Sequence, residues 1–198
     1  MVEVQLPVEN LQKCEKVKCR PYRICLGILT KHNLKQFRII NECVFPVEYS
    51  DSFYQDILKT DKYCRLAYFN DIIVGAICYR FDHFDQQGNK VPSNTPKSIK
   101  KCYIMTLGCL SQYRELGVGT KLLNHAIRTC QKVQNVESIY LHVHTVNETG
   151  LDFYKRRNFH HVKLISDYYS MIEPAGAYEL EKNLIDCEKV EDSDNDFE

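Results

Sequence analysis

The amino-acid sequence predicts one α/β (α+β) domain, in which helices cover a sheet. Segments that alternate apolar and polar residues in the manner of strands take turns along the chain with segments of helical periodicity. The length of 198 residues, 44% of them hydrophobic, suits a single core. We expect the folded domain to span residues 24–185, between a flexible extension over 1–23 and an acidic, disordered tail over 186–198.

The first part of the domain is predicted to form a strand and then two helices. Residues 24–28 are a short β-like run, and Thr30 can cap a helix whose apolar residues recur at helical spacing. Pro46 ends this helix, because proline disfavours helical geometry in the residue before it. Ser50 or Asp51 can cap the second, shorter helix.

Strand-like and helical segments then alternate to the end of the domain. Asn70-Asp71 is a tight-turn sequence between two β-like runs. Residues 81–101 are polar and are punctuated by one glycine and two prolines, so we expect a long exposed loop there. The predicted strands are 65–69, 72–79, 101–110, 138–145, 159–166 and 177–184, and the predicted helices are 117–130 and 147–157.

Composition argues against several classes of function. The 26 basic and 26 acidic residues give no net charge, so we expect no direct DNA binding. Residues 186–198 carry seven acids and one lysine, which leaves the body mildly basic and suited to an anionic cofactor. The longest apolar run is too short to span a membrane, and the first ten residues lack a secretory signal. The ten cysteines are therefore expected to be reduced thiols of a cytoplasmic or nuclear protein, and their spacing favours no metal site.

The strongest predicted helix opens with a glycine motif. Arg114-x-x-Gly117-x-Gly119 stands between strand 101–110 and helix 117–130. Glycine lets the backbone approach a ligand closely, and the free N–H groups of a first helical turn suit a phosphate. A tight turn into a helix would show the same pattern, so the motif alone leaves both interpretations open.

Six groups of residues, spread over most of the chain, match one known family. They are Phe45-Pro46-Val47-x-Tyr49, Leu66-Ala67-Tyr68-Phe69-Asn70-Asp71-Ile72, Tyr103-Ile104-Met105-Thr106-Leu107-Gly108-Cys109-Leu110, Tyr140-Leu141-His142-Val143, Asp152-Phe153-Tyr154, and Tyr168-Tyr169 with Ile172-Glu173-Pro174-Ala175. They resemble the San-type N-alpha-acetyltransferases of the GNAT superfamily, which provide the catalytic subunit of the NatE activity. The resemblance implies a mixed, twisted central sheet flanked by helices, with a V-shaped splay between strands 101–110 and 138–145 that holds acetyl-CoA.

The resemblance also implies a role for each matching residue. Tyr103 and His142 are implied to be the catalytic pair. The implied acetyl-CoA site comprises Leu107, Gly108, Cys109, Arg114, Glu115, Leu116, Gly117, Val118, Gly119, Thr120, Asn147 and Tyr154. The implied peptide site comprises Phe45, Pro46, Val47, Tyr49, Met105, Tyr168, Tyr169 and Ile172. No metal is implied.

The activity implied by the resemblance is acetyl transfer from acetyl-CoA to the α-amine of protein N-termini. The family prefers a retained methionine followed by a bulky apolar residue. Its members associate with the ribosome-bound NatA complex, so NatA-type subunits and the ribosome are expected partners beside the N-terminal peptide itself. Two alternatives stay open: a non-catalytic subunit that binds acetyl-CoA, and a lysine acetyltransferase.

These residue types suit the chemistry. The attacking amine must be neutral, and an α-amine has a pKa of about 7.7–8.0 against about 10.4 for lysine. A modest base such as His142 is then enough, whereas Tyr103 could be a base only if its pKa were strongly perturbed, so we expect it to order water or share a proton relay. A backbone N–H near Leu107 is the expected oxyanion donor, and Tyr154 could donate a proton to the departing thiolate.

Two residues depart from the family pattern. Glu115 stands where the family tends to carry a second arginine, which should weaken the attraction for the phosphates of CoA. Asn158 stands where the superfamily commonly has glycine. Because asparagine tolerates positive φ, we expect that turn to survive.

Overall fold

The computed structural model describes residues 22–59 and 63–184. Its elements are β1 (Ile24–Ile28), α1 (Leu34–Val44), α2 (Asp51–Lys59), β2 (Cys64–Phe69), β3 (Ile72–Phe84), β4 (Lys90–Val91), β5 (Ile99–Cys109), a 3-10 turn (Ser111–Tyr113), α3 (Val118–Lys132), β6 (Val136–His144), α4 (Glu148–Lys155), β7 (His160–Ile165) and β8 (Ala177–Asn183). The extension predicted over 1–23 and the tail predicted over 186–198 lie almost wholly outside the described residues, and both stay predictions.

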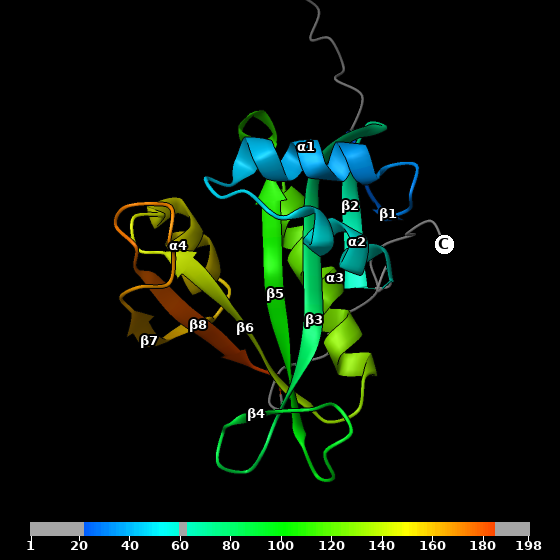
Figure 1. Ribbon diagram of the computed structural model, residues 1–198. Helices are drawn as coiled ribbons and strands as arrows, with labels where there is room; N and C mark the ends of the chain where they lie inside the picture. Colours follow the sequence, from blue (N-terminus) through cyan, green and yellow to red (C-terminus); the bar gives the residue numbers. More distant parts are fainter. Residues whose placement is uncertain (1–21, 60–62, 185–198) are drawn as a thin grey trace, which may run out of the picture.

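The described strands form one mixed sheet, as the sequence predicts. The sheet has eight strands in the order β1-β2-β3-β5-β6-β8-β7, and β4 pairs with β3 outside this path. Strands β5 and β6 run parallel, and the other pairs are antiparallel. The parallel pair in the middle requires a crossover connection, which α3 provides (Figure 1).

Strands β5 and β6 pair over only part of their length. Their register runs from Lys100 opposite Val136 to Tyr103 opposite Tyr140 and stops there. Beyond this point β6 leaves with β7, β8 and α4, while β5 continues beside β3, so the two strands stand apart in the shape of a V (Figure 1). The predicted splay is therefore present, and it begins at Tyr103.

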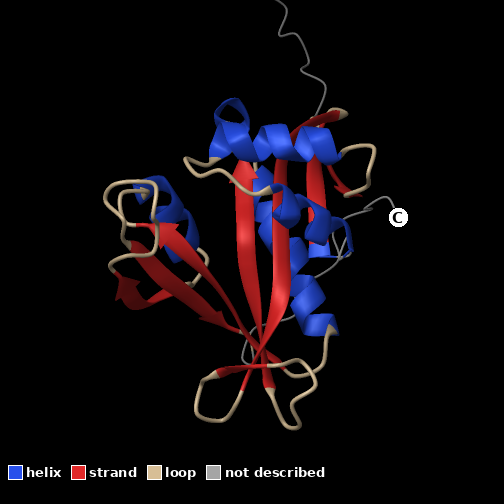
Figure 2. Ribbon diagram, in the orientation of Figure 1, coloured by secondary structure: helices blue, strands red, loops and turns tan. Residues whose placement is uncertain are grey.

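Helices cover both faces of the sheet (Figure 2). Successive residues of β3 point to opposite faces, so Ile77 lies in the core beneath α3 whereas Cys78 lies in the core beneath α1 and α2. These two buried clusters fix the orientation of β3 and β5. Strand β5, which carries Tyr103, is thus held between two packed layers.

A β-bulge in β5 changes which face its side chains use. Cys78 pairs with Thr106 and Tyr79 pairs with Ile104, so Met105 is an extra residue in the ladder. The side chains of Tyr103 and Met105 both contact Arg80, whereas Leu107 packs on the core beneath α3. The bulge therefore changes the face of the sheet to which the side chains of β5 point, at the start of the splay.

Two predicted boundaries are wrong. Helix α1 begins at Leu34 rather than at a Thr30 cap, because the Asn33 side chain accepts a hydrogen bond from the Thr30 N–H (2.7 Å) and closes a turn there. The long loop predicted over 81–101 is largely a hairpin: β3 extends to Phe84, which pairs with Ile99. Its polar sequence concealed the strands, because this end of the hairpin extends beyond the helices and has no continuous apolar face (Figure 2).

Several local predictions are confirmed. Asn70 and Asp71 both have positive φ (46° and 72°), as a tight hairpin turn of this kind requires. The Ser50 hydroxyl accepts a hydrogen bond from the Phe53 N–H at the start of α2 (3.4 Å). Asn158 adopts the predicted positive φ (62°), so the turn before β7 survives without glycine.

Candidate active site

Tyr103 and His142 meet where β5 and β6 stop pairing. The Tyr103 hydroxyl lies 3.2 Å from Nδ1 of His142 and 2.9 Å from the hydroxyl of Tyr168. The ring of Tyr168 stacks on the imidazole at 4.4 Å. The structure thus brings together the two residues predicted to be catalytic and one residue predicted to bind peptide.

A carboxylate occupies the other side of the imidazole. Nε2 of His142 lies 3.2 Å from Oε2 of Glu179, and Nζ of Lys163 lies 3.3 Å from the same oxygen. Burial lowers the pKa of His142, and the charge and hydrogen bond of Glu179 oppose part of that shift. His142 is therefore neutral near pH 7 and has a lone pair with which to accept a proton. Sequence reasoning missed Glu179, since nothing in the sequence fixes which residue of β8 faces His142.

The protonation of Tyr103 follows from its surroundings. Burial and then the neighbouring Tyr168 raise its pKa above the usual value for tyrosine, so the phenol stays protonated. A neutral phenol can donate a hydrogen bond to His142 Nδ1 while it accepts another hydrogen bond, from Tyr168 or from a water. This agrees with the expectation that Tyr103 shares a relay and is not itself the base.

Aromatic residues gather on the peptide side of the splay. Tyr49 lies between the rings of Phe45 (6.0 Å) and Phe53 (4.6 Å). Burial and then the neighbouring Tyr169 and Tyr168 raise the pKa of Tyr49. The loop after α1 and the loop before β8 thus approach one another over β5.

The loop before β8 is held closed by backbone and side-chain hydrogen bonds. The N–H groups of Tyr168 and Tyr169 both donate to the Ala175 carbonyl (3.0 and 2.9 Å). Nε2 of His144 lies 2.5 Å from the Pro174 carbonyl, and the His144 ring contacts Tyr169. His144, which had no predicted role, anchors this loop.

The remaining residues predicted to bind peptide sit around these aromatics. Met105 packs with the core beneath α1 and α2, and Phe45 lies over Gly108, where an added Cβ would come within 3.2 Å of its ring. Val47 and Ile172 are half-buried, and Pro46 is exposed. Their contact with peptide stays a prediction.

The N-terminus of α3 has the backbone geometry of an anion site. Glu115 and Gly117 both have positive φ (62° and 90°), and the first hydrogen bond of the helix runs from the Lys121 N–H to the Gly117 carbonyl. The N–H groups of Val118, Gly119 and Thr120 consequently have no partner within the helix. With the exposed guanidinium of Arg114 nearby, this end can hold the pyrophosphate of CoA.

The two glycines of the motif are needed for different reasons. Gly117 has open space around it and is needed for its left-handed φ. An added Cβ at Gly119 would lie 3.2 Å from the ring of Phe153, which also packs against the guanidinium of Arg157 at 3.7 Å. The close approach at Gly119 is thus to an aromatic ring of α4, and its approach to a ligand stays a prediction.

Asn147 and Tyr154, also predicted to bind the cofactor, both lie on the α4 side of the splay. The Asn147 side chain caps α4 by accepting a hydrogen bond from the Gly150 N–H (3.0 Å). Tyr154 is 7% exposed, and its ring contacts Phe153 and Phe159. Its hydroxyl makes no hydrogen bond within the described part of the chain, so it is available to a ligand.

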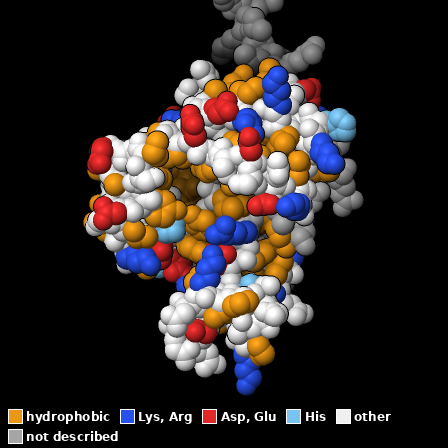
Figure 3. Space-filling view, viewed as in Figure 1, with side chains coloured by type: hydrophobic (Ala, Val, Ile, Leu, Met, Phe, Trp, Pro, Cys, Tyr) orange, Lys and Arg blue, Asp and Glu red, His pale blue; other side chains and the backbone are white. Residues whose placement is uncertain are grey.

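The surface is hollowed between the two arms of the splay. Figure 3 shows this depression, lined with hydrophobic side chains, between β6 and β5. One end faces the hydrogen-bonded pair at Tyr103, and the open edges of β5 and β6 offer backbone groups to a ligand. A long thioester with an anionic head fits these features, so the residues present suit acetyl-CoA.

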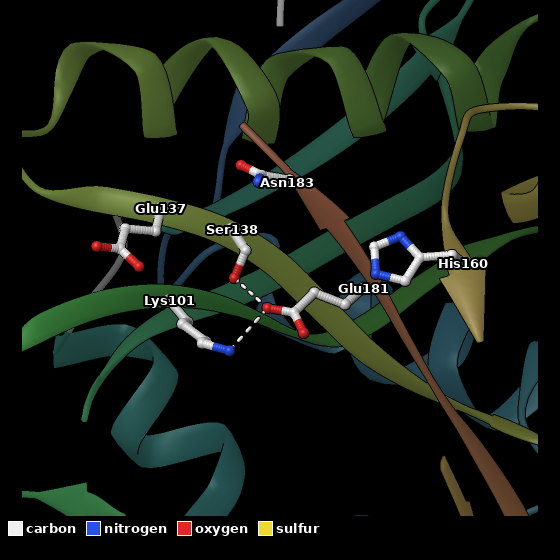
Figure 4. Close-up of a pocket in the computed structure, with 6 residues that line it drawn as sticks. All are labelled: Lys101, Glu137, Ser138, His160, Glu181 and Asn183. Atoms are coloured by element: carbon white, nitrogen blue, oxygen red, sulfur yellow. Dashed lines mark hydrogen bonds and ion pairs between the residues drawn. The ribbon is translucent and has the colours of Figure 1, made fainter. Parts of the chain in front are cut away.

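A second polar cluster supports the base of the splay. Lys101 pairs with Glu181 (2.8 Å), which also accepts a short hydrogen bond from Ser138 (Figure 4). Glu137, His160 and Asn183 complete the pocket. These bonds join β5, β6 and β8 next to the last residues that pair β5 with β6, and so they support the point where the strands separate.

A buried aspartate, Asp82, binds two residues whose side chains contact the ring of Tyr103. Asp82 is 5% exposed, accepts a hydrogen bond from Tyr140 (2.7 Å) and pairs with Arg80 and Lys90 (3.1 and 2.9 Å). Burial alone would raise the pKa of Asp82, but the bonds from Lys90 and Tyr140 and the charge of Arg80 outweigh it and lower the pKa. The Tyr140 ring lies 4.9 Å from that of Tyr103.

Asp82→Ala is expected to lower the free energy of unfolding at pH 7 by about 1–3 kcal/mol, because it leaves the half-buried Tyr140 hydroxyl without its acceptor. Arg80 and Lys90 are half exposed and become hydrated in the variant, so the loss of their ion pairs with Asp82 adds little to the destabilisation. Because the pKa of Asp82 is lowered in the folded protein, its carboxylate stabilises the fold above about pH 4, and this stabilisation is lost as the pH falls through the folded-state pKa. Urea unfolding of both proteins at pH 7 and pH 3 measures this, and a difference that grows at pH 3 would contradict it.

None of the described helices is long and apolar enough to cross a membrane. Residues 22–59 and 63–184 hold no group of three or more His, Cys, Asp or Glu side chains placed to bind a metal ion.

Known proteins are similar to this chain in sequence and in fold. The model of the acetyltransferase (GNAT) family matches residues 31–159. N-alpha-acetyltransferase 50 of Danio rerio is 47% identical over 162 residues, 82% of this chain and 89% of that protein. The probable N-acetyltransferase san of Drosophila melanogaster is 44% identical over 159 residues, 80% of each. The structure of Arabidopsis thaliana Naa50 with the bisubstrate analogue CoA-Ac-MVNAL has a TM-score of 0.68 and 39% identity, covering 80% of this chain and 97% of that one.

A splayed mixed sheet, with a helix start beside the gap whose free N–H groups suit an anion, is the arrangement expected of an acyl-CoA-dependent transferase. The chain belongs to the acetyltransferase (GNAT) family. Acetyl-CoA is accordingly its acetyl donor.

Proposed function

We propose that this enzyme acetylates the α-amine of protein N-termini that retain methionine and carry a bulky apolar second residue. The broader activity is acetyl transfer from acetyl-CoA to a protein N-terminus, the activity for which the Danio rerio relative is named. The observation that carries the proposal is the hydrogen-bonded pair of Tyr103 and His142 at the point where the sheet opens. Both partners needed for proton removal are therefore beside the space suited to a thioester.

The chain's residues have a definite task in this reaction. The neutral amine forms a bond to the acetyl carbon, the C–S bond breaks, and the amine gives up one proton. His142 Nδ1 accepts that proton, through the Tyr103 hydroxyl or a water held by it. A backbone N–H of β5 near Leu107 can stabilise the oxyanion, and Tyr154, with its raised pKa and unpaired hydroxyl, can donate a hydrogen bond to the departing sulfur.

The preference for methionine is supported by the apolar character of the proposed pocket. Phe45, Met105 and Ile172 offer hydrocarbon surface, and Tyr168 and Tyr169 offer hydroxyls for a peptide backbone. An unbranched, flexible side chain such as methionine adapts to such a site. The analogue bound to the Arabidopsis thaliana protein carries the peptide MVNAL, which also begins with methionine.

Peptides that begin Met-Leu are expected to be acetylated about ten- to a hundredfold faster, in kcat/KM, than peptides that begin with serine. Burying a methionine side chain gains about 1.5–3 kcal/mol, which corresponds to that ratio. A peptide with only an internal lysine should be slower still, since its amine is almost wholly protonated near pH 7.5. Parallel assays with labelled acetyl-CoA measure all three rates.

The same assays separate the alternatives. Equal rates for serine and methionine peptides would remove the methionine pocket. Faster acetylation of lysine would make the protein a lysine acetyltransferase, and acetyl-CoA binding without any transfer would make it a non-catalytic subunit. We further propose a cytoplasmic or nuclear protein, from the sequence features given above, and an association with NatA-type subunits and the ribosome, from the resemblance alone. Co-purification of tagged protein with ribosomes would test the association.

A further inference from the structure

Glu179 faces His142 from the neighbouring strand and takes no part in the reaction as proposed above. His142 and Glu179 are directly opposite in the β6–β8 register, and Lys163 is opposite Glu179 in the β7–β8 register. The three side chains thus form a row across three strands that ends at Tyr103. The His142 and Glu179 side chains are largely buried (12% and 16% exposed), whereas Lys163 is 59% exposed.

The row determines which nitrogen of His142 carries its proton. A carboxylate only accepts hydrogen bonds, so the contact between Glu179 Oε2 and His142 Nε2 requires a proton on Nε2. In a neutral imidazole, Nδ1 is then the acceptor. Nδ1 is also the nitrogen that faces the Tyr103 hydroxyl, at 3.2 Å. Without Glu179, nothing on the β8 side would favour this tautomer over the other.

We propose that Glu179 is a positioning residue that keeps His142 in the Nε2–H tautomer and stabilises the imidazolium formed when Nδ1 accepts the proton. The inference rests on the proposed role of His142 as proton acceptor. The step moves one proton from the amine to Nδ1 and changes no other bond of the protein. The new positive charge then lies between the carboxylate of Glu179 and the neutral phenol of Tyr103.

Lys163 acts on the same carboxylate in the opposite sense. It shares Oε2 with His142, so its charge offsets part of the attraction between Glu179 and an imidazolium. The rings of Tyr103, Tyr140 and Tyr168 also surround His142. Burial raises the pKa of Tyr103 and of Tyr140, so these two phenols stay neutral. Beside burial, which lowers the pKa of His142, Glu179 and Lys163 are thus the two charges that act on its proton affinity.

Opposite effects are expected from two conservative variants. Activity falls as the pH drops through the pKa of His142, because the imidazolium cannot accept a proton. Glu179 raises that pKa and Lys163 lowers it. Glu179→Gln should therefore move the acid limb of the kcat/KM profile to lower pH, and Lys163→Gln should move it slightly to higher pH. Titration of the substrate amine is common to all three proteins and cancels in the comparison.

The rate itself should fall only in the first variant. Glu179→Gln should lower kcat by about 10- to 100-fold, the range seen when metal-binding histidines lose such a carboxylate partner. Lys163→Gln should keep kcat within about threefold, because an exposed cation contributes little through water. A purely structural role for Glu179 predicts loss of folded protein without a shift of the acid limb.

The tautomer of His142 can be measured without an activity assay. Long-range proton–nitrogen NMR of the free wild-type protein should show His142 protonated at Nε2, and Glu179→Leu should give a mixture of tautomers. A proton on Nδ1 in an active wild-type protein, or equal shifts of the acid limb in both glutamine variants, would overturn this inference alone. A wild-type protein that acetylates no peptide would instead overturn the proposed function, whatever the tautomer.

Discussion

His142→Phe is expected to lower kcat by about 10²-fold or more while acetyl-CoA still binds, because the variant lacks the proton acceptor but keeps a flat ring in its place. The imidazole has two polar contacts, Tyr103 on one nitrogen and Glu179 on the other, and phenylalanine makes neither. The stacking of Tyr168 on this ring can persist, so the peptide side of the splay should keep its shape. Steady-state kinetics with a Met-Leu peptide and calorimetric titration of acetyl-CoA measure the two effects separately.

His161→Phe is a matched control for this variant. His161 is exposed on β7, in the same sheet, and its ring contacts Tyr178 of β8 rather than Tyr103 or His142. It should keep wild-type kinetics. If His142→Phe also kept a near wild-type rate, His142 would be a structural histidine, and another group would have to remove the proton.

The sequence predicts strands best where a helix covers one of their faces. It predicts helices best where they pack on the sheet. Helix α3 and strand β6 are recovered within about two residues, because burial on one side gives them a regular pattern. The prediction fails over 81–101, where the hairpin extends past the covering helices and its residues lack that pattern. The strands in this region are stabilised by pairing with each other. The periodicity of a single segment does not reveal such pairing.

The site residues likewise fall into those that the sequence predicts and those that it does not. Tyr103 and His142 are found from the strings that resemble a known family, and the structure brings them within hydrogen-bonding distance. Glu179 and the bulge at Met105 escape prediction because both depend on register, which is set by contacts between strands far apart in the sequence. The chemistry-bearing side chains are thus predictable here, and the groups that orient them are not.

The glycine motif shows how one pattern can serve two purposes. The sequence motif alone left open both the approach of a phosphate and a tight turn into a helix, and the family resemblance placed both glycines in the acetyl-CoA site. The structure requires Gly117 for its backbone conformation and Gly119 for contact with Phe153. A test of anion binding at α3 must therefore separate a loss of packing from a loss of charge complementarity.

Gly119→Glu is expected to lower the affinity for acetyl-CoA by about 100-fold or more, with the fold retained. The new carboxylate would stand in the first turn of α3, where unpaired N–H groups and the helix dipole attract it. It would therefore occupy the donors that the pyrophosphate needs and repel the ligand's own charge. Its attraction to the helix start, worth about 0.3–1 kcal/mol, offsets part of the cost of moving the Phe153 ring.

Gly119→Ala distinguishes the two effects. Its methyl group meets the same ring at 3.2 Å, so Phe153 must shift by a few tenths of an ångström in both variants, but only glutamate adds charge. Calorimetry should show the alanine variant within about fivefold of wild type, which corresponds to about 1 kcal/mol, and thermal unfolding should show both variants folded. Equal losses in the two variants would mean that Gly119 serves the packing of α4 alone. Unchanged affinity in Gly119→Glu would mean that the start of α3 does not bind the pyrophosphate.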